Sequence, residues 1–156
     1  MNGRDLIERL REEVVVGDGA MGTMLQAQGV PWNANFDLLN LTNPDLVASI
    51  HRDYALAGAQ VVETNTFGAN RNKLRRVGAE EGVREANLAG VRVARASVPD
   101  GVCVAGAMGP YGKADQEAGE VSETDRSEAF REQAEALLEG GADLVILETF
   151  SDLEEI

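Results

Sequence analysis

The sequence contains very little of what marks a secreted or membrane-embedded protein. Its 156 residues include one cysteine, which excludes an internal disulfide, and no apolar run approaches the roughly 18 residues of a membrane-spanning helix. The first residues, Met1–Leu6, also lack the apolar core of a signal peptide. These absences predict a cytoplasmic protein.

Positive charge is also scarce. The chain has 14 lysine and arginine residues against 27 aspartate and glutamate residues, which gives a net charge of -13. A surface of this sign repels phosphate backbones and anionic lipid headgroups, so neither nucleic acid nor a membrane is expected as a partner. The apolar content of 44% is ordinary for a globular protein, and the length suits one domain.

What the sequence does contain is a glycine-rich stretch directly after a run of valines. Val14–Val16 favour a buried strand, because β-branched side chains fit the pleated surface of a sheet. Gly17, Gly19 and Gly22 then let the backbone turn toward a short helix. This order puts Asp18 at the end of a strand, beside the free N–H groups of a helix start.

The same glycines match the G-x-G-x-x-G pattern of dinucleotide-binding proteins. That pattern lays a pyrophosphate on helix N–H groups, and the charge of Asp18 would repel it. The acidic residue expected about 20 positions later is Asp37, which lies in a segment typical of a loop. A small zwitterion fits better, with Asp18 facing its ammonium group and the helix N–H groups facing its carboxylate.

Strand-like and helix-like segments alternate along the rest of the chain. Apolar strands are expected at residues 61–63, 102–107 and 143–147, and helices at 43–58, 83–96 and 122–140. Continuous apolar strands separated by helices indicate an α/β fold with a parallel sheet. Residues 1–156 then form either the first four βα units of a (β/α)8 TIM barrel, which needs about 250 residues in full, or a doubly wound flavodoxin-like sheet.

Polar residues follow the expected strands, at the edge where ligands bind in both architectures. Asp18, Thr64, Asn65 and Glu148 hold such positions. Two carboxylates that meet at one edge of a sheet, Asp18 and Glu148, would bind an ammonium group. The loop at residues 64–70 suits a pocket wall and a helix cap equally well.

Three further features receive structural interpretations. Cys103 lies inside an apolar strand and is expected to be an inert core thiol. His51 lies within a helix and has no Cys, His or carboxylate near it at metal-ligand spacing, so it is interpreted as an ordinary helix residue. The basic segment at residues 71–76 is expected to form a solvated helix face.

Four segments at the expected strand ends form a recognisable set. They are Gly17–Thr23 (GDGAMGT), Glu63–Asn70 (ETNTFGAN), Ala105–Gly112 (AGAMGPYG) and Leu147–Phe150 (LETF). Together they make the chain resemble the homocysteine S-methyltransferase family. The resemblance implies a (β/α)8 barrel that transfers a methyl group to the homocysteine thiol and so forms methionine. Residues 1–156 would be its N-terminal, homocysteine-binding half.

The resemblance also implies roles for individual residues, although it identifies no catalytic residue in this chain. Asp18 and Glu148 resemble the two carboxylates that hold the homocysteine amino group. Gly19, Ala20, Met21 and Thr64 resemble the wall around the carboxylate of homocysteine, and Asn65 is also assigned to the substrate site. The first three would act through their backbone N–H groups.

The zinc-binding half of the family's site has no counterpart here. Family members hold zinc with three cysteines on later strands, and the metal deprotonates a thiol whose free pKa is about 8.5. Cys103 lies on the third expected strand, where the family has no ligand, so no metal ligand is predicted in this chain. The chain alone is therefore expected to be inactive.

Several alternatives stay open from the sequence. Relatives use betaine, methylfolate, methylcobalamin or S-methylmethionine as the methyl donor, which leaves cobalamin and folate as candidate cofactors. Besides homocysteine, the expected partners are further domains of a longer polypeptide or a second copy of the chain. The second functional hypothesis is a non-enzymatic, doubly wound domain that binds a small molecule or nucleotide. An exposed apolar edge on the last strand would favour a fragment or a dimer.

Overall fold

Three parallel strands form the centre of the protein. The computed structural model describes residues 3–112 and 122–156. The strands β1 (Val61–Glu63), β2 (Cys103–Met108) and β3 (Leu144–Leu147) lie side by side in chain order, with β2 between the other two. The predicted α/β fold with a parallel sheet is confirmed. A flavodoxin-like sheet instead reverses its strand order near the start, and no such reversal occurs among these strands.

The predicted first strand is the main error of the sequence interpretation. In place of a buried strand at residues 14–16, the structure has a single parallel bridge between Gly17 and Val61. The Val16 carbonyl accepts the N–H groups of Gln60 (2.8 Å) and Val61 (3.3 Å), whereas the N–H of Val16 donates to the Gln60 side chain (3.0 Å). Val14 is 89% exposed, and of the three valines only Val15 packs against a core cluster in the described chain.

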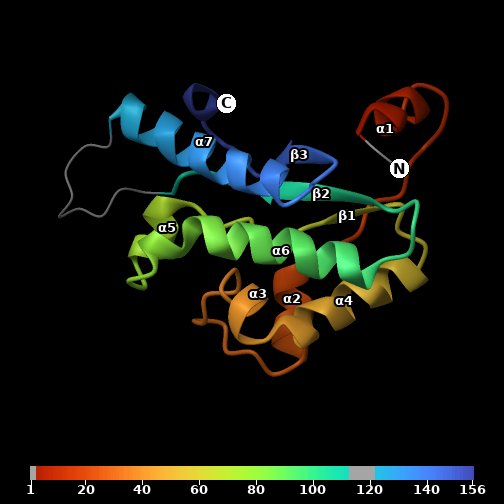
Figure 1. Cartoon of the computed structure of the whole chain (residues 1–156), viewed down its shortest axis with the longest axis horizontal. Coiled ribbons are helices and arrows are strands. Elements are labelled where there is room, and N and C mark those ends of the chain that lie inside the picture. Colours follow the sequence, from red (N-terminus) through yellow and green to blue (C-terminus); the bar gives the residue numbers. More distant parts are fainter. Residues whose placement is uncertain (1–2, 113–121) are drawn as a thin grey trace.

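The helices surround this small sheet. Their bounds are α1 (Gly3–Arg9), α2 (Met21–Ala27), α3 (Leu39–Thr42), α4 (Pro44–Leu56), α5 (Arg71–Arg75), α6 (Val83–Ser97) and α7 (Glu123–Glu139), with short 3-10 turns η1 (Glu80–Gly82) and η2 (Leu153–Glu155). Figure 1 shows α6 and α7 running alongside the strands and α4 next to α6, in agreement with the contacts between these elements. Within the described residues, no helix has the length and apolar character to cross a bilayer.

The two faces of the sheet are covered differently. Val62 and Val104 point toward the helices and join Val91 and Leu137 in the largest core cluster. On the opposite face, Leu6 of α1 packs on a second cluster that includes the first residues of β1 and β2. Because α1 covers the amino-terminal ends of the strands, the carboxyl-terminal ends are left for the loops that follow each strand.

Strand β3 closes the described sheet on one side and is only partly covered. Its residues Leu144–Ile146 are half-buried, and Leu147 is 50% exposed. A strand with one neighbour leaves a row of N–H and C=O groups able to pair with another chain segment. The exposed apolar edge that the sequence interpretation named as a sign of a fragment or a dimer is therefore present.

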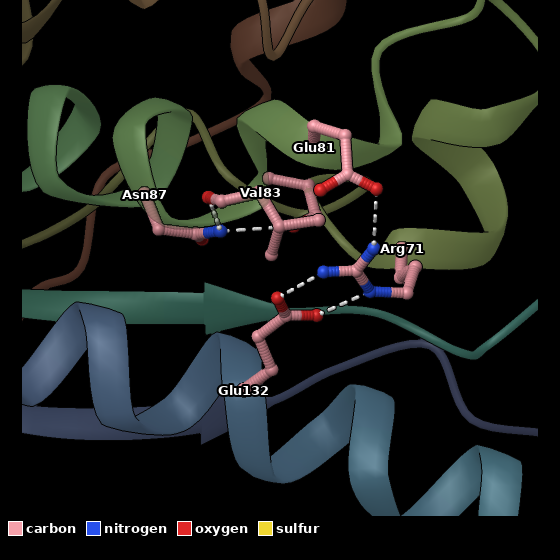
Figure 2. A network of polar contacts seen from close by, with 6 residues as sticks. Arg71, Glu81, Val83, Asn87 and Glu132 are labelled. Atoms are coloured by element: carbon pink, nitrogen blue, oxygen red, sulfur yellow. Dashed lines mark hydrogen bonds and ion pairs between the residues drawn. The ribbon is translucent and has the colours of Figure 1, made fainter.

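Polar contacts hold α5 and the loop that precedes it against the neighbouring elements. Figure 2 shows Arg71 of α5 between Glu132 of α7 and Glu81 of η1, with hydrogen bonds of 2.6 and 2.9 Å to Glu132 and 3.3 Å to Glu81. Deeper in the molecule, Asn87 donates to the Ala69 carbonyl (2.8 Å). These contacts fix the loop at residues 64–70 relative to the rest of the molecule.

Candidate functional site

A cavity of about 830 Å³ lies at the carboxyl-terminal ends of β1 and β3. Every residue that the sequence assigned to a substrate site lines this cavity. The full lining is Asp18, Gly19, Ala20, Met21, Gly22, Gln26, Trp32, Ala34, Asn35, Phe36, Asp37, Glu63, Thr64, Asn65, Phe67, Gly68, Lys73, Glu148 and Thr149. Asp18 and Glu148, far apart in the sequence, thus face one space. A role in binding does not follow from this position alone and stays a prediction.

Asp18 is held in place by the backbone of β1. Its N–H donates to the Val61 carbonyl (3.0 Å), and its carboxylate accepts the N–H of Glu63 (3.0 Å). Partial burial raises the pKa of Asp18 to about 6, and the charge of Glu148 adds to that effect against the hydrogen bond from Glu63. A carboxylate of this kind gains more from a cationic ligand than one in water, because less solvent competes for it.

Glu63 and Asp37 are two further carboxylates in the cavity, and the sequence interpretation missed both as site residues. Glu63 lies next to Asp18 and Glu148. Burial first, and then the charges of Glu148 and Asp18, raise its pKa to about 7, with a hydrogen bond to Glu148 acting in the same direction. The signal that could have found Glu63 is the repeated pair Glu63-Thr64 and Glu148-Thr149 at two strand exits.

Thr64 lines the cavity, but its hydroxyl group serves the sheet. The oxygen accepts the N–H of Ala107 (3.1 Å) and lies 2.6 Å from the hydroxyl of Thr66, which donates to the Ala107 carbonyl (2.8 Å). Since each hydroxyl has one proton, Thr64 donates to Thr66. Its proton is committed within the fold, so Thr64 contributes shape to the cavity wall rather than a hydrogen bond to a ligand.

The loop after β1 combines both functions that the sequence left open. Asn65 lines the cavity, while its side-chain amide donates to the Phe36 carbonyl (2.7 Å) and to Asn40 (3.3 Å). Asn70 caps α5, because its side chain accepts the N–H of Lys73 (2.9 Å). The start of this loop forms a pocket wall, and its end caps a helix.

The segment Gly19–Met21 leads from Asp18 into α2. Ala20 is the N-cap residue, in extended conformation, and its carbonyl accepts the hydroxyl of Tyr54 (3.0 Å). A side chain at Gly19 would crowd that tyrosine, since an added Cβ would lie 3.0 Å from its oxygen. Residues Gly19–Gly22 at the start of α2 line the cavity, and the first N–H groups of a helix have no partners within it.

The far part of the cavity contains a lysine beside the carboxylate of Asp37. Lys73 lines it, with Nζ 4.3 Å from the centre of the Phe67 ring. Burial lowers the pKa of Lys73, while the charge of Asp37 opposes that shift. The expectation of a solvated helix face at residues 71–76 is therefore wrong for Lys73 and for Arg71, and fits only the exposed Arg75 and Arg76.

The other interpretations concern residues outside the cavity. Cys103 is fully buried in β2, and burial raises the pKa of its thiol to about 11, as expected for a core thiol. His51 is fully buried in α4, and burial lowers its pKa to about 4. Among residues 3–112 and 122–156, no group of three or more His, Cys, Asp or Glu side chains is arranged to hold a metal ion.

Comparisons with known proteins agree with the resemblance seen in the sequence. Residues 15–156 match the family model of homocysteine S-methyltransferase. The methionine synthases of Mycobacterium tuberculosis and Mycobacterium leprae are each 38% identical over 97% of the chain. The chain spans 14% of the length of these two relatives.

A solved structure shares the fold. The metallated form of the homocysteine methyltransferase MmuM from Escherichia coli superposes with a TM-score of 0.79 at 30% identity, covering 96% of this chain and 59% of MmuM. Its apo form gives a TM-score of 0.66 at 28% identity. The match to the family model covers most of the chain, and the parallel sheet agrees with that of MmuM. The chain belongs to the homocysteine S-methyltransferase family.

Proposed function

We propose that this chain is the homocysteine-binding half of a methyltransferase that forms methionine. Residues 1–156 would supply the first four βα units of a (β/α)8 barrel, with the remaining units and the methyl donor provided from outside the described residues. The consecutive order of the parallel strands and the partly covered edge of β3 support this proposal. So does the chain's partial coverage of its relatives.

The observation that carries the proposal is that Asp18 and Glu148 line one cavity. Homocysteine is a zwitterion at neutral pH, and its ammonium group needs carboxylate partners in a site shielded from water. In the proposed pose the ammonium group lies between Asp18 and Glu148. Its positive charge also favours the ionised form of Glu63, so binding of homocysteine releases a proton near neutral pH.

The carboxylate of homocysteine would lie against the start of α2, where the N–H groups of Gly19, Ala20 and Met21 provide donors. Thr64 and Asn65 would shape the wall without donating, because their side-chain protons are already committed. This pose leaves the thiol directed away from both charged groups.

Zinc is implied by the family but is not matched by the residues present. Cys103 is buried in the core with a raised pKa, and His51 is fully buried within α4, and neither lines the cavity. The ligands that would bind and deprotonate the thiol must therefore come from another part of the protein. In the proposed function this chain binds and orients the amino acid and has no methyltransferase activity alone.

Isothermal titration calorimetry with homocysteine tests the proposal. We expect Asp18→Asn and Glu148→Gln each to weaken binding about 10- to 100-fold, because each removes a charged partner of the ammonium group. Glu85→Gln, an exposed change of the same type on α6, should leave the affinity unchanged. If the unaltered chain binds NAD but not homocysteine, the proposal is wrong and the second hypothesis, a nucleotide-binding domain, takes its place.

A further inference from the structure

The cavity has an acidic region and a second region that contains Lys73, and the proposed substrate uses only the first. The carboxylates of Asp18, Glu63 and Glu148 line the region next to β1 and β3, whereas Lys73 lines the region next to α5 together with Asp37. A volume of about 830 Å³ is typical of a pocket for a drug-sized ligand. A four-carbon amino acid fills only part of such a space, so the region at Lys73 is available to another group.

The position of Lys73 is fixed by its surroundings. Its backbone N–H donates to the cap residue Asn70, which sets the first turn of α5. Its ammonium group lies over the ring of Phe67, and its side-chain carbons approach Gly68 and Gly112. An added Cβ at Gly68 would lie 3.4 Å from Cδ of Lys73 and 2.6 Å from the Asp37 carboxylate, so a glycine here lets both charged side chains approach the loop.

The charge of Lys73 is only partly compensated within the fold. The charges of Asp37, Glu155 and Glu148 act on it through space, and one oxygen of the Asp37 carboxylate accepts the N–H of Gly68 (2.8 Å). Among the described residues, no carboxylate lies within ion-pair distance of Lys73. A half-buried lysine without an ion pair is costly. An anionic ligand in the cavity would remove that cost.

We infer that Lys73 forms a second, anion-binding subsite of this cavity, for a carboxylate or phosphate group of the substrate that brings the methyl group. The inference rests on the proposed function for the identity of the first substrate. Homocysteine cannot satisfy both regions with its own carboxylate if that group lies at the start of α2. The anion at Lys73 therefore belongs to a different molecule, held on the thiol side of homocysteine.

One series of ligands can test both regions together. S-(ω-carboxyalkyl)homocysteines of increasing length carry a carboxylate from the sulfur toward Lys73, and S-alkylhomocysteines of equal length are their uncharged counterparts. S-(ω-phosphonoalkyl)homocysteines of the same lengths tell whether the subsite prefers a carboxylate or a phosphate-like group. Calorimetry with the whole chain gives each affinity, and circular dichroism verifies that each variant is folded.

In the unaltered chain we expect one length of the charged series to bind about tenfold or more tightly than its uncharged counterpart. Lys73→Met keeps most of the side-chain volume and should abolish that difference, while Lys73→Arg should retain it. Arg52→Met, a change on the exposed side of α4, serves as the control and should have no effect. Homocysteine itself should bind all four proteins within about twofold.

Three results would overturn the subsite. They are a charged series that gains nothing at any length, a gain that persists in Lys73→Met, and an equal loss of homocysteine binding in Lys73→Met. The last result would make Lys73 part of the homocysteine site. Failure of the unaltered chain to bind homocysteine would instead refute the proposed function, so the two ideas fail separately.

Discussion

The pair Glu-Thr occurs at the ends of two strands, as Glu63-Thr64 at β1 and as Glu148-Thr149 at β3, and the two pairs have different environments. Glu63 is the last residue of β1, and Thr64 follows it and is buried. This strand has the Gly17 bridge on one side and β2 on the other. After β3, Glu148 is only partly buried and Thr149 is exposed, with a backbone φ of 62°. The same two residue types are thus part of the sheet in one place and form a loop at its edge in the other.

The difference comes from what lies beside each strand. β1 has β2 on one side and the Gly17 bridge on the other, whereas β3 pairs with β2 alone. A residue at the end of a strand that is flanked on both sides is enclosed, so its hydroxyl must find partners within the protein. A residue at the end of an edge strand can use solvent and has more freedom in its backbone. The repeated Glu-Thr pair therefore identifies residues that line the cavity. The position of each strand in the sheet determines whether those residues are enclosed by the fold or exposed to solvent.

The largest effect is expected from Thr64→Val. The change leaves the Ala107 N–H without its acceptor and Thr66 without the hydroxyl that donates to it, inside the sheet. Loss of buried hydrogen bonds of this kind should lower the free energy of unfolding by about 2–3 kcal/mol. Urea denaturation measures this value. The matched change Thr149→Val should stay within about 0.5 kcal/mol, and equal losses at both positions would contradict the distinction.

Glu63→Gln should have a smaller, pH-dependent effect. The pKa of Glu63 is about 7 in the folded protein against 4.5 ordinarily, so the folded state binds more protons in this range. Stability of the unaltered chain should therefore fall as the pH rises from about 4.5 to 7 because of this group.

The variant lacks that loss, so its melting temperature should exceed that of the unaltered chain at pH 8 and approach it near pH 5. Melting curves at both pH values measure the difference. A Glu85→Gln variant, altered at an exposed site, controls for the chemical change. A gain that is the same at the two pH values would mean that Glu63 is not desolvated in the folded protein.

The smallest effect is expected from Thr149→Gly. A β-branched residue with φ of 62° is strained, and glycine removes that strain while adding freedom to the unfolded chain. These opposing effects should leave a gain of about 0.5 kcal/mol, measured by urea denaturation. At Thr64 the same substitution should be strongly destabilising, because no positive φ is present there to favour glycine.

The sequence predicted well those features that depend on local chemistry and on strand order. The three strands occur where apolar runs were expected, and Ser122 caps α7 by accepting the N–H of Asp125 (3.1 Å). Pro44 begins α4, as its fixed φ suggests. Residues that follow strands were correctly expected to share one edge of the sheet, since parallel strands end on the same side.

Features that depend on side-chain partners distant in sequence were not predictable in this way. The valine run at residues 14–16 has the composition of a strand, but the N–H of Val16 donates to the Gln60 side chain. Lys73 lies in a basic segment that looks solvated, and only the fold turns it toward Phe67 and Asp37. Composition alone carries no information about either contact.

The central strand β2 contains a cysteine, Cys103, whose reactivity can report on opening of the structure. Cys103 has no exposed surface, and with a pKa of about 11 its thiol holds very little of the reactive anion. Because β2 is paired on both sides, fraying of β3 should leave the sulfur shielded. Because Leu6 of α1 covers the cluster that contains Cys103, alkylation by iodoacetamide would follow either detachment of α1 or cooperative unfolding, and a Leu6→Ala variant would separate the two.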